Sequence, residues 1–572
     1  MNYDPKLRVS EEVGAEKHRQ RGETFEASMR RQAKALADDQ EHEEALLDIY
    51  LNRRFLNAGR VQAAAGSFRD VTAFNCFVSG TIEDSMVSIM DKAKEAALTM
   101  QKGGGIGYDF SSIRPSGAHI KSLDSHASGP LSFMEVFNSV CGTVASAGNR
   151  RGAQMGVLRV DHPDIEAFIE AKTNTHRLTN FNVSVGITDA FMRAVVADTQ
   201  FDLQFEGVVY KTVSAVALWD KIMMATWDWA EPGVLFIDRI NEENNLWYCE
   251  TIAATNPCGE QPLPPYGACL LGSFNWAAYI YRSNGDYLFN LNQLVRDIPH
   301  IVRAMDNVID RTIYPLPQQE QEARYKRRMG LGATGVANAL EAIGFPYGTR
   351  AFLRKARSIQ KFVTIACYRA SIDLAKEKGS FPMLDRELFI RSKFMERMPS
   401  SIREDILTHG IRNSHLTSIA PTGSISLAAD NVSSGIEPPF ALEYDRKILM
   451  EDGSSRVEKV TDYGYRELGV RGVVSDELSP KEHVSVLTAF QEYIDSACSK
   501  TCNIGAEVSF TDFKGVYMQA WEEGAKGCTT FRATGKRMGI LNAPSPAEDL
   551  PAEEDEGGAA CYINEYGEKS CD

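Results

Sequence analysis

Residues 255–275 read TNPCGEQPLPPYGACLLGSFN, the densest set of reactive side chains in this 572-residue chain. Asn256, Cys258 and Glu260 alternate, so their side chains point the same way if the segment is extended. Pro257 restricts the backbone and Gly259 relaxes it, which suits a rigid loop tip better than a strand interior. A carboxylate beside a thiol can act as a general base for a substrate hydroxyl. The pattern therefore predicts a reactive loop tip rather than a turn with an incidental cysteine.

Two further cysteines lie in apolar surroundings, Cys269 in the same stretch and Cys76 in AFNCFVSG (73–80). The chain has 11 cysteines, an odd number, and no CxxC pair. This pattern argues against a disulfide framework and against a structural zinc site, so we predict no metal ligands. Sequence alone does not pair Cys76 with Cys269, and each by itself is typical of a buried cysteine.

Composition and charge narrow the class of protein. No apolar run reaches the roughly 18–20 residues of a membrane span, and the polar N-terminus lacks a secretory signal, so we predict a cytoplasmic protein. The net charge of −15 and the lack of a basic stripe argue against nucleic acid as a partner. The densest basic stretch, RYKRR (324–328), is interpreted as a solvated face just before a helix.

The chain divides into three parts. Residues 1–60 are expected to form a helical N-terminal region, because EEALLDIYLNRRFL (43–56) has apolar residues at helical spacing. From 61 to 540, strand-like runs alternate with helical patterns, which favours an α/β architecture. The strand-like runs include 74–80, 180–188 and 416–420, and the helical stretches include 85–102 and 297–310.

The last part, 541–572, changes character. Residues 542–560 are rich in Pro, Ala, Gly and acidic residues, which predicts a flexible linker. Beyond it, Cys561 and Cys571 stand near the end of the chain with little apolar sequence around them. A redox role is the better interpretation for this pair.

Three glycine-containing segments invite a nucleotide-site interpretation. PTGSIS (421–426) follows an apolar run and offers backbone N–H groups and hydroxyls to a phosphate, although it lacks the lysine of a Walker loop. GLGATG (330–335) matches a dinucleotide fingerprint but follows charged residues, so we interpret it as a tightly packed helix start. KGGGIGYDF (102–110) is expected to end a helix and to let the backbone approach a ligand.

Several of these segments together resemble the large catalytic chain of ribonucleotide reductases, in its adenosylcobalamin-dependent branch. The resemblance covers roughly residues 50 to 540 in the family's order, which is far more specific than any single motif. The matching segments are NPCGEQPL, ACLLGSFN, NCFVSGTIEDSM, GGGIGYDFSSIRPSG, ASGPLSFMEVF, RRGAQMGVLRVDHPDI, RRMGLGATGVANAL, TSIAPTGSIS and SSGIEPPFALEY.

The resemblance implies a ten-stranded α/β barrel with a central finger loop that carries Cys258, here within residues 61–540. Cys258 would hold the thiyl radical, Glu260 would take a proton from the ribose and Asn256 would bind its hydroxyls. Cys76 and Cys269 would become a disulfide as they supply two electrons. Thioredoxin or glutaredoxin would restore them through the tail cysteines, Cys561 and Cys571.

The resemblance also implies two nucleotide sites. The substrate, expected to be a ribonucleoside diphosphate, would contact Asn75, Gly105 and the six residues Pro421, Thr422, Gly423, Ser424, Ile425 and Ser426. A dNTP or ATP effector would bind at the interface of a homodimer, near Asp84, Ser112, Arg114, Lys172 and Arg177.

Alternatives remain at this level. A relative that receives its radical from a separate metal-containing subunit would carry a Tyr-Tyr pair, and this chain has no such dipeptide. A nucleotide-binding regulator without catalysis would not need Cys258 and Glu260, and an NAD-dependent dehydrogenase would need a strand–turn–helix around 330–335. DSHASG (124–129) matches a pattern in which histidine ligates cobalt, but we interpret His126 as incidental.

Overall fold

The computed structural model describes residues 3–146, 150–151, 153–173, 177–449, 455–532, 561–563 and 569–571. Its centre is an eight-stranded sheet in the order β15-β2-β3-β8-β9-β12-β23-β22. The bounds are β15 Ala268–Cys269, β2 Cys76–Val78, β3 Gly105–Asp109, β8 Gln154–Arg159, β9 Phe181–Ile187, β12 Gly233–Phe236, β23 Gly527–Arg532 and β22 Thr501–Ile504.

Five neighbouring strands of this sheet, β2, β3, β8, β9 and β12, run parallel. The outer pairs reverse direction, since β15 is antiparallel to β2 and β23 is antiparallel to β12. The parallel strands are buried along almost their whole length, as expected when both faces of a sheet are covered. The α/β prediction is thereby confirmed.

A second sheet has three strands in the order β1-β16-β19, with bounds β1 Phe55–Asn57, β16 Leu271–Asn275 and β19 Gly330–Thr334. Single parallel bridges continue it, from Leu331 to Thr417 and from Ile419 to Cys498, towards β22 of the large sheet. The predicted strand at 416–420 is therefore present as two bridges. The described pairing is a large sheet and a small one, and does not record a closed ten-stranded barrel.

Helices surround the two sheets. The longer ones are α2 Phe25–Leu36, α3 Gln40–Leu51, α5 Met86–Gln101, α6 Pro130–Thr143, α9 Ala215–Trp229, α11 Leu291–Arg311, α12 Pro317–Lys326, α14 Arg350–Lys378, α17 Ser400–His409, α20 Pro480–Gln491 and α21 Phe510–Glu522. The shorter ones include α1 Arg8–Val13, α4 Gly59–Ala64, α8 Asp189–Val196, α13 Val336–Ala342, α18 Gly423–Ala428 and α19 Tyr463–Leu468.

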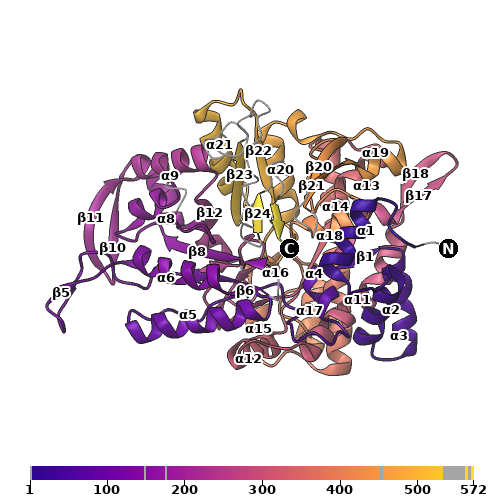
Figure 1. Ribbon diagram of the computed structural model, residues 1–572, viewed down its shortest axis with the longest axis horizontal. Coiled ribbons are helices and arrows are strands. Elements are labelled where there is room, and N and C mark those ends of the chain that lie inside the picture. The colour runs from indigo at the N-terminus through magenta and orange to yellow at the C-terminus, as the bar shows by residue number, and fades with distance from the viewer. Residues whose placement is uncertain are drawn as a thin grey trace.

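The N-terminal helices pack on much later parts of the chain, as Figure 1 shows. Helices α2 and α3 lie against α11, while α1 lies against α18. Thr24 and Asp39 cap α2 and α3 by accepting hydrogen bonds from backbone N–H groups of the first turn. The expected helical character of residues 1–60 is present, and the predicted domain boundaries stay a prediction.

Hairpins project from this body. They are β4 His119–Ile120 with β5 Ser125–His126, β10 Gln200–Phe205 with β11 Val208–Ser214, β17 Ile280–Ser283 with β18 Asp286–Phe289, and β20 Glu443–Leu449 with β21 Ser455–Thr461. Within the predicted tail, Cys561–Ile563 (β24) and Lys569–Cys571 (β25) form another hairpin, and β25 lies beside α18. The predicted linker at 542–560 lies outside the described residues.

Two sequence interpretations were wrong. GLGATG is mostly the buried strand β19, and α13 begins only after Gly335, whose φ is +66°. The glycines are needed because Ser418 packs against the strand: a Cβ at Gly332 would lie 2.4 Å from its carbonyl oxygen. In RYKRR, Arg327 and Arg328 are buried rather than solvated, because each pairs with buried carboxylates, Arg327 with Asp306 and Arg328 with Glu250.

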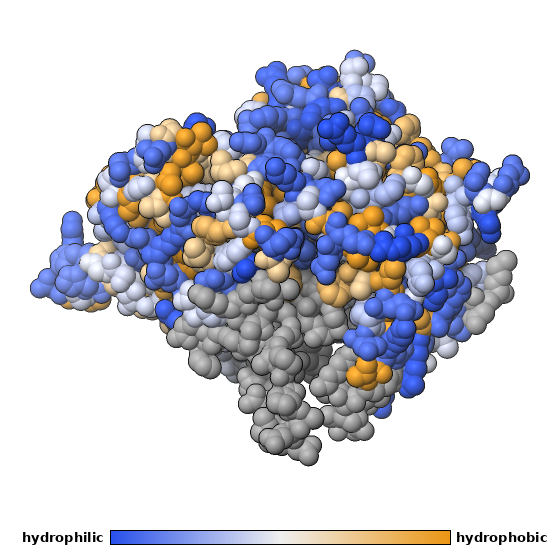
Figure 2. Space-filling view, turned by 90° about the horizontal axis from the view of Figure 1, so that it is seen from above, coloured by the Kyte–Doolittle hydropathy of each residue, from blue (hydrophilic) through white to orange (hydrophobic). Residues whose placement is uncertain are grey.

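The face of the molecule seen from above is mixed in character. Figure 2 shows mostly hydrophilic residues with apolar ones scattered between them. Over the part of the chain that the structure describes, no helix combines the length and apolar character needed to cross a membrane. The cytoplasmic location stays a prediction.

Candidate active site

The segment that carries Cys258 is a short hairpin. Strands β13 (Ala254–Thr255) and β14 (Pro262–Leu263) pair antiparallel and hold the loop between them. Asn256 closes this loop, because its backbone N–H donates to the carbonyl of Gln261 and its side-chain Oδ1 accepts from the backbone N–H of Gln261, 3.0 Å away. Gly259, with a φ of +81°, makes the turn beyond Cys258. The predicted loop tip is present.

The finger, as we name residues 254–263, is enclosed on one side by the large sheet. A Cβ added at Gly107 in β3 would lie 1.9 Å from the carbonyl oxygen of Thr255, so β3 passes against the finger with no room for a side chain. Asn182 in β9 donates through Nδ2 to the carbonyl of Pro257 at 3.3 Å. On the other side, the carbonyl of Glu260 accepts hydrogen bonds from Ser418 and Ala497. Cys258 and Glu260 are each only 1% exposed.

Cys76 and Cys269 are direct partners across β2 and β15. Opposite residues of an antiparallel pair have Cα atoms about 4.5–5.5 Å apart, within the range that a disulfide can bridge. Both are buried free thiols. Burial raises the pKa of Cys76 to about 12, with a further rise from the negative charge of Glu260. Burial also raises the pKa of Cys269, again aided by Glu260, so both thiols stay protonated at neutral pH.

Cys258 is disulfide-bonded in this structure and is not among the free cysteines. Cys76 and Cys269, which face each other across β2 and β15, are instead free thiols.

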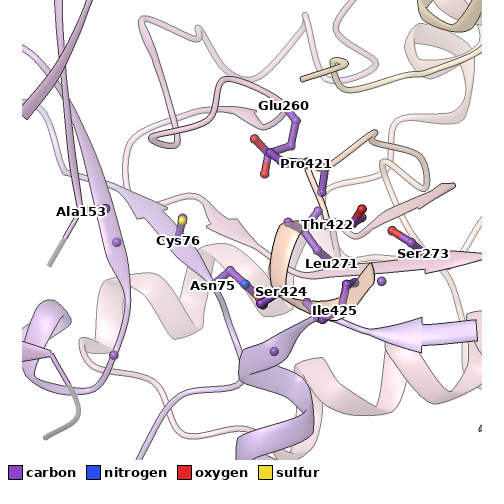
Figure 3. Close-up of a pocket in the computed structure, with 16 residues that line it drawn as sticks. Asn75, Cys76, Ala153, Glu260, Leu271, Ser273, Pro421, Thr422, Ser424 and Ile425 are labelled. Carbon is purple, nitrogen blue, oxygen red and sulfur yellow. The ribbon is translucent and has the colours of Figure 1, made fainter. Parts of the chain in front are cut away.

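A cavity lies beside the finger. Figure 3 shows the carboxylate of Glu260 and the thiol of Cys76 directed towards the same space, with Thr422 and Ser424 on a further wall. Of the residues predicted to bind substrate, Asn75, Gly105, Pro421, Thr422, Ser424 and Ile425 line the cavity.

Two predicted substrate residues, Gly423 and Ser426, are not among the lining residues. The hydroxyl of Ser426 is instead within 2.9 Å of the hydroxyl of Ser434, on the side of α18 away from the cavity lining. Asn75, by contrast, supports the prediction of substrate binding. Its side-chain Oδ1 is buried without a hydrogen-bond partner. Buried polar atoms normally have partners, so this oxygen marks a place where a polar ligand belongs.

Sequence reasoning missed the contribution of the N-terminal region to this cavity. Ala58 and Gly59 line it, and His18 lies 3.1 Å from the hydroxyl of Ser424 through its Nε2. His18 ends a π-helix, Gly14–His18, an uncommon element that is frequent at functional sites. The π-helix indicates a functional role for this region, but it is a backbone feature that no sequence pattern predicted.

The tail cysteines are described by their backbone alone. Cys561 and Cys571 are direct partners in the β24–β25 hairpin, and β25 lies beside α18, which carries the cavity residues Ser424 and Ile425. The C-terminal hairpin is therefore next to the wall of the cavity.

The predicted effector residues fall into two groups. Asp84 and Ser112 line a surface hollow, and Arg114 donates to Asp84 through Nε at 2.6 Å. Lys172 instead donates to the backbone carbonyls of 178 and 181, and Arg177 pairs with Glu135 on α6. Neither lines the hollow, and residues 174–176 between them lie outside the described residues.

No group of three His, Cys, Asp or Glu side chains is arranged to hold a metal ion anywhere in the described ranges. His126 stands on the projecting β4–β5 hairpin, opposite His119. It is exposed and does not line the cavity beside the finger.

Comparison with known proteins agrees with this geometry. A sequence model described as "Ribonucleotide reductase, barrel domain" matches residues 74–531. A vitamin B12-dependent ribonucleoside-diphosphate reductase of Mycobacterium tuberculosis is 36% identical over 516 residues, which cover 85% of this chain and 71% of the relative. One of Thermoplasma acidophilum is 33% identical, with 84% and 64% covered. A ribonucleoside-diphosphate reductase large subunit of Variola virus is 26% identical, with 82% and 63% covered. The chain belongs to the ribonucleotide reductase family.

Proposed function

We propose that this chain reduces ribonucleoside diphosphates to 2′-deoxyribonucleotides by radical chemistry at Cys258, with adenosylcobalamin as the source of the radical. The observation that carries the proposal is the finger, which brings Glu260 to the same cavity as Cys76, whose cross-strand partner is Cys269. A nucleophilic or hydrolytic enzyme would have no use for two protonated thiols beside a buried carboxylate.

We propose that the two sheets act as the family's ten-stranded barrel. One half would be β2, β3, β8, β9 and β12, and the other β16, β19, the bridged segment 416–419, the segment 497–504 that includes β22, and β23. The parallel bridges Leu331–Thr417 and Ile419–Cys498 support this arrangement, since they continue β19 towards β22. The finger would then lie inside the barrel, where a thiyl radical is shielded from solvent.

The chemistry begins at Cys258. Its thiyl radical takes the hydrogen atom from C3′ of the ribose, and Glu260 takes the proton of the 3′-hydroxyl as the 2′-hydroxyl leaves as water. Asn256, at the base of the same loop, would bind the ribose hydroxyls. Both Cys258 and Glu260 are almost fully buried, which strengthens their interactions with a bound substrate by excluding water.

Cys76 and Cys269 supply the reducing equivalents. Two thiols give up two electrons and two protons and become one disulfide, while the ribose loses its 2′-oxygen as water and Cys258 returns hydrogen to C3′. The raised pKa values of both thiols suit this role, because the hydrogens are still on the sulfur atoms when the substrate arrives. Their cross-strand register allows the disulfide to form without separating the strands.

Small residues make up much of the cavity wall. Seven of its lining residues have no side chain beyond Cβ, so backbone and methyl groups form much of the surface: Ala58, Gly59, Gly103, Gly105, Ala153, Gly272 and Ala420. Such a wall would hold a broad flat ring through close contacts. When bound, adenosylcobalamin supplies the hydrogen-atom acceptor that converts the Cys258 thiol to its radical.

We propose that Cys561 and Cys571 reduce the Cys76–Cys269 disulfide by thiol exchange and are themselves restored by thioredoxin or glutaredoxin. Their register within the hairpin and the position of β25 beside α18 support this transfer. The phosphates of the substrate would rest on the segment from Pro421 to Ser426. A dNTP or ATP effector would occupy the hollow at Asp84 and Ser112 in a homodimer.

The alternative, a catalytic subunit that depends on a separate metal-containing subunit, is less well supported. The viral large subunit is less similar to this chain than the two vitamin B12-dependent relatives are. The chain also lacks the Tyr-Tyr dipeptide expected for long-range radical entry.

The variant Cys258→Ala tests the proposal. We expect it to bind ribonucleotide as the wild-type chain does, measured by equilibrium dialysis, and to form no deoxyribonucleotide. Cys141→Ala is a matched control, because Cys141 is a buried thiol in α6, away from the finger and the cavity, and it should keep the wild-type rate. Appreciable product from Cys258→Ala would contradict the proposed radical site.

A further inference from the structure

Two segments that are not regular strands donate hydrogen bonds to the finger on the side opposite β3. The carbonyl oxygen of Glu260 accepts a hydrogen bond from the hydroxyl of Ser418 at 2.9 Å and from the backbone N–H of Ala497 at 3.0 Å. These two donors belong to the segments 416–419 and 495–499, which meet each other through the single bridge at Ile419. Any shift of either segment would be passed directly to the peptide that carries the Glu260 side chain.

Asp495 joins these two segments through its carboxylate. Its Oδ2 accepts from the backbone N–H of Leu416 at 2.8 Å, and its Oδ1 accepts from the backbone N–H of Thr417 at 2.9 Å. The backbone N–H of Asp495 donates in return to the hydroxyl of Thr417 at 2.9 Å. One residue therefore sets the register of 416–419, and with it Ser418, against 495–499, and with it Ala497.

Asp495 is itself fixed from two further sides. Tyr368 in α14 donates its hydroxyl to Oδ2 at 2.8 Å. Lys526, just before β23, donates through Nζ to the backbone carbonyls of Asp495 and Ser496, each at 2.7 Å. Asp495 and Lys526 are each 2% exposed, and a carboxylate buried this deeply is tolerated only when its oxygens are well satisfied. The three hydrogen bonds to its two oxygens meet that need.

We infer that Asp495 is a positioning residue for Glu260: it fixes Ser418 and Ala497, and through them the place of the catalytic carboxylate. The inference rests on the proposed role of Glu260 as the proton acceptor. Asp495 does not line the cavity and is not expected to touch the substrate. Its loss should therefore slow the chemical step without weakening the binding of the ribonucleotide.

Asp495→Asn is the sharpest change, because the amide keeps the size of the carboxylate but turns one acceptor towards a backbone N–H as a donor. A misplacement of about 1 Å at a catalytic group can cost about 100-fold, so we expect kcat to fall about 10- to 100-fold while KM changes less than about twofold. Asp462→Asn is the matched control: Asp462 is also buried and accepts from Asn338 and from a backbone N–H, and its variant should keep kcat.

A double-mutant cycle with Glu260→Gln separates positioning from general stability. If Asp495 acts through the Glu260 carboxylate, Asp495→Asn should cause no further loss in the Glu260→Gln background, measured with a radiolabelled substrate that detects residual product. An equal loss in both backgrounds, or an unchanged kcat for Asp495→Asn alone, would overturn the inference. If Asp495→Asn fails to fold, Ser418→Ala carries the same test, because it removes one of the two donors to Glu260.

Different results would refute the proposed function and the positioning role of Asp495. Full activity of Glu260→Gln would refute the role of Glu260 and with it the proposed function. An inactive Glu260→Gln together with a fully active Asp495→Asn would refute only the positioning role of Asp495.

Discussion

Gly107→Ala should displace the finger by a distance that the structure defines. The added Cβ would lie 1.9 Å from the carbonyl oxygen of Thr255, whereas real Cβ atoms essentially never approach a heavy atom within 3.0 Å. Either β3 or the finger must therefore move by at least about 1 Å. Overpacking of this kind costs about 1–3 kcal/mol of stability, and a 1 Å misplacement of catalytic groups costs about 100-fold in rate. We expect a folded variant with a kcat reduced about 100-fold.

Gly186→Ala is the matched control in β9, which belongs to the same sheet and is separated from β3 by β8. Its Cβ would meet nothing nearer than the side chain of Val157 at 3.6 Å, an ordinary contact. Neither glycine has a positive φ, so alanine is conformationally permitted at both positions and only the steric difference remains. Unfolding in guanidinium chloride reports the stability of each variant, and steady-state reductase kinetics report kcat and KM. A folded Gly107→Ala variant with wild-type kcat, or equal losses in both variants, would refute the account of the finger.

Three further predictions concern the thiols and one buried carboxyl. Cys76→Ser leaves no pair able to form the disulfide, so a pre-reduced chain without external reductant should form almost no product in a rapid-quench experiment; one product per chain would contradict the proposed electron source. Cys561→Ser or Cys571→Ser should spare the first turnover and block multiple turnovers with thioredoxin, and sustained turnover would show that the tail is not the shuttle. Burial raises the pKa of Glu341 to about 7 from 4.5, so its contribution to stability is present below pH 4.5 and is lost as the pH rises through 7. Glu341→Gln should therefore increase the free energy of unfolding at pH 8 by up to about 3 kcal/mol and change it little at pH 4.5, whereas the same gain at both pH values would disagree with the raised pKa.

Local patterns in the sequence predicted the finger well. Alternation of Asn256, Cys258 and Glu260 around a proline and a glycine is a short-range signal, and the structure has a hairpin there. The pairing of Cys76 with Cys269 depends on long-range structure rather than on a local pattern. Their strands are far apart in sequence, and a shift of one residue in register would turn one thiol to the other face of the sheet. Residue patterns alone could not supply that register, and it was expected only from the family resemblance.

The incorrect interpretations share a cause. GLGATG was judged by the charged residues before it, but the buried strand β19 is made of those glycines because Ser418 crosses it closely. Arg327 and Arg328 were judged by their charge, although carboxylates distant in sequence, Asp306 and Glu250, make their burial favourable. The support of Glu260 by Asp495 was missed for the same reason. In each case, the decisive partner lies elsewhere in the chain.

The most direct test of the central claim is a reductase assay on the purified, reduced chain with and without adenosylcobalamin. We predict formation of deoxyribonucleotide from a ribonucleoside diphosphate when adenosylcobalamin and a dithiol are the only additions, no product without the cofactor, and none with the Cys258→Ala variant. Product that appears only after a second, metal-containing protein is added would contradict the account.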